Sequence, residues 1–153
     1  MDDEPDFAIL LAAAWRALTD ELQEAMQLAG LDMRPSFGYV LRAVAAEQPT
    51  INRLAALLDV TKQAASQLAD EVERAGFIER FDDPADRRRR RLRLTAQGAK
   101  VRALAIATSE RLERQLAAQA GPEAVAGCRS TLTALVTRRG ALEEVLARRA
   151  RMV

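Results

Sequence analysis

Residues 54–98 read LAALLDVTKQAASQLADEVERAGFIERFDDPADRRRRRLRLTAQG, and this stretch decides the fold. Together with the residues just before it, the stretch places apolar side chains at helical spacing over residues 51–58 and again over residues 64–75. A short polar break at residues 59–61 separates the two runs, and Gly76 ends the second one. Two helices joined by so short a turn predict a helix-turn-helix.

The second part of the stretch changes to the alternating pattern of strands. Residues 77–81 (FIERF) and 91–95 (RLRLT) read as two short strands, and residues 82–86 (DDPAD) between them read as a turn. Because five consecutive arginines follow the turn, the sequence predicts a two-stranded hairpin with a basic tip.

Helices are expected on both sides of this stretch. Alanine is abundant and aromatic residues reach only 4%, a composition that favours helix. Apolar periodicity, interrupted by Pro and Gly, places further helices at residues 7–29, 35–47 and 96–119, and a last one from residue 122 through Leu146. We therefore predict a mainly α fold with one small hairpin.

The net charge of +1 hides an uneven distribution. Residues 1–49 carry 3 basic and 9 acidic side chains, residues 50–100 carry 11 and 8, and residues 101–153 carry 9 and 5. Six arginines, at positions 87–91 and 93, lie on or beside the hairpin tip, where their field suits a polyanion. The plainer alternative is a solvated run that the acidic residues of the hairpin balance, namely Asp82, Asp83 and Asp86.

The second helix of the helix-turn-helix offers polar side chains near its N-terminus. In this motif that helix enters the major groove, where Gln, Lys, Thr and Ser can reach base edges or phosphates. The residues of this kind that are expected to face outward are Thr61, Lys62, Gln63, Ser66 and Gln67. Because any amphipathic surface helix has a polar face, this interpretation depends on the basic hairpin that follows.

The composition excludes several kinds of chemistry. The chain has no histidine and one cysteine, which excludes a His-containing catalytic triad, a zinc site of the usual type and an internal disulfide. No glycine-rich phosphate loop is present, and the apolar run at residues 7–15 is too short to cross a bilayer. We predict a cytoplasmic protein with no enzymatic activity, cofactor, metal or membrane contact.

Residues 54–98 closely resemble the winged helix-turn-helix of MarR-type bacterial transcriptional regulators, and they align with it without gaps. The wing motif of that family, Asp-Pro-x-Asp-Arg-Arg, stands at residues 83–88, and its Leu-Thr-x-x-Gly stands at residues 94–98. The flanking helices agree in number, order and length, so the resemblance covers nearly the whole chain. It implies a homodimer with interlocking terminal helices that binds double-stranded DNA.

The resemblance also implies roles for the matching residues. The outward side chains of the second helix would face the major groove, and the basic residues of the wing would reach the minor groove. The carboxylate that precedes them would hold the wing. These wing residues are Arg87, Arg88, Arg89 and Arg90, and the carboxylate is that of Asp86.

Three positions depart from the family pattern. Asp59 stands where glycine is common in the turn, and because Asp tolerates left-handed geometry we expect the turn to survive. Gln67 stands where many relatives have arginine, which weakens one expected contact with DNA. Arg89 and Arg90 extend the basic tip, which should strengthen binding and lower its selectivity.

The first and last helices carry apolar faces that are too extensive for a small winged domain to cover. A two-fold dimer would bury them and place two recognition helices about one DNA turn apart. The alternative is a monomer in which these helices pack on their own domain. We therefore divide the chain into dimerisation helices at residues 1–34 and 99–153 and a DNA-binding region at residues 35–98.

In many members of the family a small, often phenolic, compound releases the DNA. Four residues could line a cavity for such an aromatic effector, although plain core packing is the commoner role of such side chains: Trp15, Met33, Phe37 and Tyr39. Cys128 is expected to be buried on the inward face of the last helix.

The sequence thus predicts a homodimeric transcriptional regulator, a repressor, that binds a pseudo-palindromic operator and is released by a small ligand. A second class of function fits the same features. In that alternative, a winged-helix dimer binds an acidic protein through its arginine-rich tip.

Overall fold

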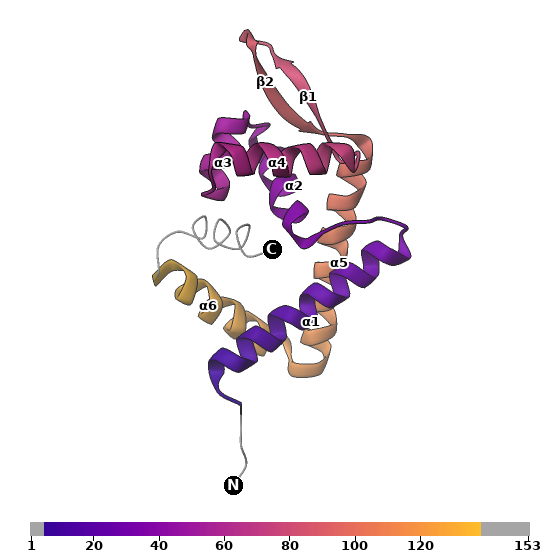
Figure 1. Ribbon diagram of the computed structural model, residues 1–153. Helices are drawn as coiled ribbons and strands as arrows, with labels where there is room; N and C mark the ends of the chain where they lie inside the picture. The colour runs from indigo at the N-terminus through magenta and orange to yellow at the C-terminus, as the bar shows by residue number, and fades with distance from the viewer. Residues whose placement is uncertain (1–4, 139–153) are drawn as a thin grey trace.

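The computed structural model describes residues 5–138, which form six α-helices and one two-stranded antiparallel sheet (Figure 1). In chain order the elements are α1 (Phe7–Leu28), α2 (Pro35–Glu47), α3 (Ile51–Leu58), α4 (Lys62–Arg74), β1 (Ile78–Asp83), β2 (Asp86–Leu94), α5 (Ala96–Ala120) and α6 (Pro122–Arg138). The predicted mainly α fold with one hairpin is confirmed. Within the described part of the chain, no helix is both long enough and apolar enough to span a membrane.

Side-chain caps set the starts of four helices. One oxygen of each cap accepts a hydrogen bond from the backbone N–H three residues later, over 2.9–3.3 Å, and the caps are Asp6, Thr50, Thr61 and Thr95. These short polar side chains satisfy N–H groups that no carbonyl of the helix can reach. Gly30, with a φ of 70°, follows the end of α1 as the sequence predicts.

One hydrophobic core lies between the helix-turn-helix, α2 and the base of the hairpin. The ring of Phe37 on α2 meets the ring of Phe77 edge to face, with centroids 6.3 Å apart and planes at 71°. Other large side chains that are at most 2% exposed are Leu41, Leu54, Val72, Ile78, Leu92 and Val101. Because α2, α3, α4, both strands and α5 all contribute, this core fixes the hairpin relative to the helix-turn-helix.

The hairpin is longer than the sequence predicts, and it projects from one end of the molecule (Figure 1). The pairing is regular from Ile78–Leu94 to Asp82–Arg90, then shifts between Asp82 and Asp83, so that Asp83 faces Asp86 across a two-residue turn at residues 84–85 and residues 87–89 bulge from β2. The turn falls within the predicted residues 82–86 but is shorter, and the arginines at positions 87–91 lie within β2. Opposite charges face each other across the strands, and such pairs stabilise a sheet.

The two terminal helices leave much of their apolar surface uncovered. α1 packs on α5 yet buries only Met26, and none of the described side chains of α6 is buried. Apolar side chains on these helices that remain 37–58% exposed are Phe7, Ile9, Leu10, Trp15, Leu18, Leu132 and Leu135. Cys128 is exposed too, so the prediction that it is buried is wrong for the single chain. Leu146, the predicted end of the last helix, lies outside the described residues.

An ion pair joins the end of α2 to the start of α3. Arg53 donates from Nε and Nη2 to the two carboxylate oxygens of Glu47, over 2.8 and 3.1 Å. These hydrogen bonds are the largest cause of a lowered pKa for Glu47, whose ordinary value is 4.5. The positive charges of Arg53 and Arg91 lower the pKa further, and desolvation of the carboxylate partly opposes these effects.

The lowered pKa of Glu47 predicts a pH-dependent contribution to stability. Because the folded-state pKa lies below that of the unfolded chain, the contribution is complete above pH 4.5 and is lost as the pH falls through the folded-state value. Glu47→Gln should therefore lower the free energy of unfolding at neutral pH, and the difference from wild type should shrink as the pH is lowered below 4.5. Chemical denaturation at a series of pH values from neutral to below 4.5 measures this difference in the free energy of unfolding. A difference that does not change with pH would contradict the ion pair between Glu47 and Arg53.

Gly98 allows α5 to touch the start of the hairpin. A Cβ at this position would stand 1.8 Å from the carbonyl oxygen of Phe77. Because that obstacle is backbone, Gly98→Ala should destabilise the fold by about 2 kcal/mol or more. The control is Gly127→Ala, which meets open space in α6 and should be neutral or stabilising by up to about 1 kcal/mol. Denaturant unfolding at equal protein concentration compares the two, and equal stabilities would rule out this close packing.

Candidate nucleic-acid interface

The five residues predicted to face outward lie together at the N-terminal end of α4. Four are exposed, namely Thr61, Lys62, Gln63 and Gln67, and Ser66 is half-buried. The opposite face of the helix is completely buried through Ala65, Ala69 and Val72. α4 therefore meets the core with small apolar side chains and meets solvent with side chains that can form hydrogen bonds.

The turn between α3 and α4 contains a left-handed residue that is not glycine. Asp59 adopts φ 48° and ψ 47°, and the N–H of Val60 then donates to the carbonyl oxygen of Ala55 over 3.0 Å. Asp adopts this conformation more readily than most other residues with a side chain. The expectation that the turn survives without glycine is confirmed.

Arg80 of β1 fixes the hairpin against α4. Its guanidinium pairs with the carboxylates of Asp70 and Glu73, both on α4, and its backbone N–H donates to Glu73 Oε1 over 3.2 Å. The Arg80 side chain is only 25% exposed, so salt screens these pairs less than it screens pairs on the open surface. Sequence analysis misses this cluster because only the packing of strand on helix brings the three residues together.

The basic run of the wing divides into paired and unpaired arginines. Arg89 pairs with Asp86 at 3.3 Å, and Arg90 pairs with Asp82 at 3.0 Å. Within residues 5–138, the exposed side chains of Arg87 and Arg88 form no ion pair or hydrogen bond. The acidic residues of the hairpin thus balance part of the run, and the two arginines nearest the turn keep their charge free.

Carboxylates hold the backbone of the turn at the tip. Oδ1 of Asp86 accepts a hydrogen bond from the N–H of Arg88 over 3.0 Å, and Oδ1 of Asp83 accepts one from the N–H of Ala85 over 2.9 Å. Such local side-chain bonds stabilise turns. This geometry supports Asp86 as a support of the wing, a role that stays a prediction.

Two further arginines of β2 contact the protein itself. Arg91 reaches the end of α2, where Nε donates to the carbonyl oxygen of Gln48 over 2.7 Å and Nη2 donates to that of Glu47 over 3.1 Å. Arg93 pairs with Glu79 at 2.7 Å and lies 5.0 Å from the centroid of the Phe81 ring. The arginines further from the turn are therefore bound to other groups of the protein, and the two nearest the turn are not.

A cavity of about 220 Å³ lies between α1 and α2. Its lining residues include Trp15, Met33 and Tyr39, which were predicted for it, and also Arg42. Phe37 is not among them, because its ring is buried in the core, so the alternative of plain core packing holds for that residue. The volume lies below the usual range of ligand sites and suits only a small compound.

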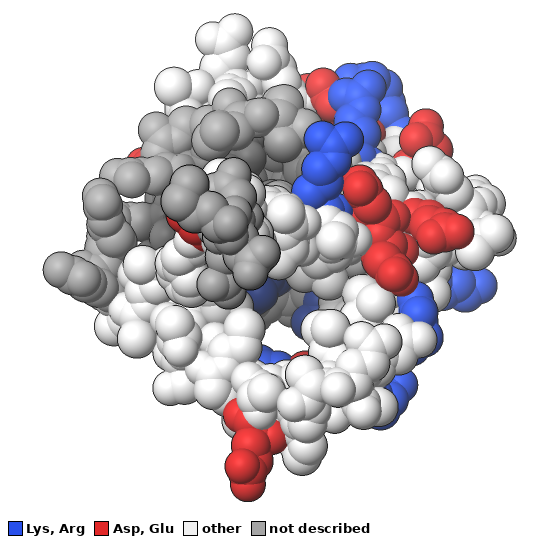
Figure 2. Space-filling model, turned by 90° about the horizontal axis from the view of Figure 1, so that it is seen from below, with Lys and Arg blue, Asp and Glu red and all other residues white. Residues whose placement is uncertain are grey.

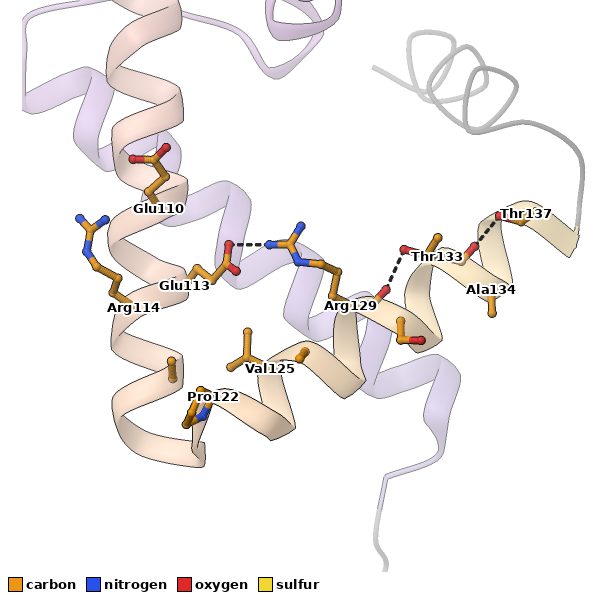
Figure 3. Close-up of a pocket in the computed structure, with 12 residues that line it drawn as sticks. Glu110, Glu113, Arg114, Pro122, Val125, Arg129, Thr133, Ala134 and Thr137 are labelled. Atoms are coloured by element: carbon orange, nitrogen blue, oxygen red, sulfur yellow. Dashed lines mark hydrogen bonds and ion pairs between the residues drawn. The ribbon is translucent and has the colours of Figure 1, made fainter.

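A larger open groove of about 870 Å³ lies between α5 and α6 (Figure 3). Small side chains form much of its wall, and Arg129 of α6 pairs with Glu113 of α5 over 2.6 Å. On the face opposite the hairpin, residues without charge cover much of the described surface, and basic and acidic residues gather along one side of it (Figure 2). The exposed charge of the hairpin and the apolar surface of α1 and α6 therefore lie at opposite ends of the chain.

Comparisons with known proteins agree with this geometry. Residues 31–89 match the model of the MarR family, a span that runs from α2 into β2. The transcriptional regulator HosA of Escherichia coli O111:H- is 35% identical over 78 residues, which cover 50% of this chain and 57% of that protein. The chain thus matches little more than half the length of this relative.

Solved structures extend the likeness over the terminal helices. The crystal structure of MarR is similar with a TM-score of 0.65 and 25% identity, over 92% of this chain and 97% of that one. The S. aureus MepR–DNA complex is similar in fold, with a TM-score of 0.69 and 23% identity over 86% of this chain and 98% of that one. Motif, fold and family model agree: residues 31–89 match the MarR family, and the chain has the winged helix-turn-helix fold of the MarR structure.

Proposed function

We propose that the chain is a transcriptional regulator, acting as a repressor, that binds double-stranded DNA as a homodimer. The observation that carries this proposal is the exposed polar end of α4 beside a hairpin whose Arg87 and Arg88 are unpaired. Both elements project from the same core, which holds them in a fixed relation (Figure 1). The cytoplasm of a bacterial cell is the proposed site of action, because similar proteins come from Escherichia coli and S. aureus.

In this function α4 enters the major groove. Gln63 and Gln67 can each pair with the N6 and N7 edge of an adenine, and Lys62 can reach a guanine or a phosphate. Thr61 and Ser66 stand where hydroxyl groups can bond to phosphate oxygens. The two glutamines are therefore the residues that we expect to select sequence.

The hairpin reaches the minor groove beside the site that α4 occupies. Arg87 and Arg88 can bring their charge to DNA without losing a partner, whereas Arg89 and Arg90 must first leave their carboxylates. Those pairs are exposed, and exposed ion pairs contribute little, so a phosphate can replace the carboxylate. Contacts with phosphate should supply most of the affinity.

Dimerisation would cover the apolar faces of α1 and α6. A two-fold axis through these helices would place two copies of α4 about one turn of DNA apart, which suits a pseudo-palindromic operator. In this arrangement residues 35–98 form the DNA-binding region, and residues 1–34 and 99–153 hold the dimer. One similar structure, a MepR variant of S. aureus, is described as bound to an oligodeoxyribonucleotide, which supports a DNA partner.

The cavity between α1 and α2 would hold a small aromatic effector. Its walls come from a helix assigned to the dimer, through Trp15, and from the DNA-binding region, through Tyr39 and Arg42. A ligand that separates these walls would shift the DNA-binding region relative to the dimer helices and release the operator. The guanidinium of Arg42 would favour an effector with an anionic group.

The unpaired arginines predict the salt dependence of DNA binding. Replacing Arg87 and Arg88 together by Ala should weaken binding to every sequence and lower the slope of log K against log salt by about 3.6, because the dimer loses both arginines from each of its two wings and each neutralised phosphate contributes about 0.9. Gln63→Ala should instead relax the preference at one base position, by about 1–3 kcal/mol. Fluorescence anisotropy on duplexes selected from a random pool measures both effects.

Arg16→Ala is the matched control for this experiment, because Arg16 is an exposed arginine on α1 and its loss should leave the slope unchanged. Equal slopes for wild type and the wing variant would overturn the wing assignment. No binding to random duplex at low salt and micromolar protein would overturn DNA binding altogether. That second result would favour the alternative in which the arginine-rich tip binds an acidic protein.

The exposed apolar face of α6 predicts its role in the dimer. Replacing Leu132 and Leu135 together by Glu should dissociate the dimer, because the interface would have to bury two unpaired charges. Sedimentation equilibrium should give the mass of one chain, 16.8 kDa, for this variant and twice that mass for wild type. Gln63→Glu, which adds a charge on α4, should stay dimeric. A wild-type mass of one chain would refute the assignment.

A further inference from the structure

Arg91 is the last member of the run of five arginines, yet its side chain contacts the protein rather than facing outward. Its Nε donates to the carbonyl oxygen of Gln48 over 2.7 Å, and its Nη2 donates to that of Glu47 over 3.1 Å. The side chain is 35% exposed, against 65% for the neighbouring Arg90. Two donors of one planar group thus meet two consecutive backbone carbonyls.

These two carbonyls are among those that the end of α2 leaves without helical partners. The last carbonyls of a helix have no N–H within the helix to accept from, and the C-terminal end of the helix dipole attracts a cation. Gln48 caps α2 in the left-handed conformation, with φ 47° and ψ 61°. Arg91 therefore supplies a charged cap that reaches α2 from the hairpin, 43 residues further along the chain.

The neighbouring residues attach the hairpin at the same place. The N–H of Leu92 donates to the carbonyl oxygen of Pro49 over 2.9 Å, so consecutive residues of β2 bond to consecutive residues of the α2–α3 connection. Nη1 of Arg91 also lies 3.9 Å from the carboxylate of Asp83, whose side chain is only 14% exposed. One guanidinium thus links β2 to β1 and to the end of α2.

No neighbouring carboxylate on α2 competes with the backbone carbonyls for Arg91. Glu47 is the carboxylate next to it on α2, and both oxygens of that group accept from Arg53. Arg91 is therefore held by backbone carbonyls and by Asp83 and not by the exposed acids that hold Arg89 and Arg90. A phosphate could replace an exposed carboxylate, but it could not replace the cap of α2 without detaching the hairpin.

We propose that Arg91 is a positioning residue of the wing: it fixes the hairpin against the end of α2, sets the direction in which Arg87 and Arg88 project, and does not itself contact DNA. The statements that Arg87 and Arg88 project toward DNA and that Arg91 does not contact it rest on the proposed function. The basic run then combines two functions, with an inner arginine that anchors the hairpin and outer arginines that carry free charge.

Hydrogen exchange of the Leu92 amide tests the anchor without DNA. Arg91→Ala should speed its exchange about tenfold, because the adjacent bonds that hold β2 to the connection are lost. Arg91→Lys should also speed it, since an ammonium keeps the charge but not the planar fork that meets both carbonyls. Arg90→Ala is the control and should leave it unchanged. Exchange of amides in the middle of α4 reports global unfolding. If the ratio of the Leu92 exchange rate to the α4 exchange rate were the same in Arg91→Ala as in wild type, the proposal would be overturned.

The salt dependence of DNA binding separates positioning from contact. Arg91→Ala should weaken binding to a selected duplex about tenfold with the slope of log K against log salt unchanged, whereas Arg88→Ala should lower the slope by about 1.8, since the dimer loses one arginine from each wing. A lower slope for Arg91→Ala would show a direct phosphate contact and overturn the proposal, as would unchanged affinity. If wild type binds no DNA, the proposed function fails, and the exchange of the Leu92 amide still decides whether Arg91 anchors the hairpin.

Discussion

The wing, the helix-turn-helix and α5 are held together at Phe77, where the chain leaves α4 and enters the hairpin. Its ring packs edge to face on Phe37, its N–H donates to the carbonyl oxygen of Val72 over 3.1 Å, and its own carbonyl oxygen accepts from the N–H of Thr95 over 3.1 Å. Gly98 lets α5 approach that same carbonyl. Because burial and backbone bonding fix the base of the hairpin, its tip can consist almost entirely of charged residues.

This constraint gives the net charge of +1 a different meaning. The sum gives no reason to expect a polyanion partner, but the fold places the basic run on a strand that projects from the core, at the end of the molecule opposite α6 (Figure 1). Within the run, neighbouring residues have different surroundings: Arg88 is free, Arg90 is paired with an exposed acid, and Arg91 caps a helix. The fold therefore decides how many arginines of the run can bind DNA, and that number is smaller than the number of arginines in the run.

Local chemistry made much of this structure predictable. Capping residues such as Thr50 and Thr61 mark helix starts in sequence. The turn is shorter than the predicted residues 82–86, because contacts between the strands, which one sequence does not reveal, extend both strands toward the tip. Cys128 was expected to be buried because periodicity identifies an apolar face but not whether the same chain covers it. The contacts of Arg80 and Arg91 join distant segments, which one sequence does not reveal.

The central claim is that two copies of α4 and two wings read one operator together. Hydroxyl-radical and methylation footprinting on a duplex selected by the wild-type protein tests it most directly. The structure predicts two protected major-groove segments with centres about 10 base pairs apart, flanked by minor-groove protection that disappears when Arg88 is replaced by Ala. A single protected segment, or minor-groove protection that Arg88→Ala leaves intact, would contradict the account.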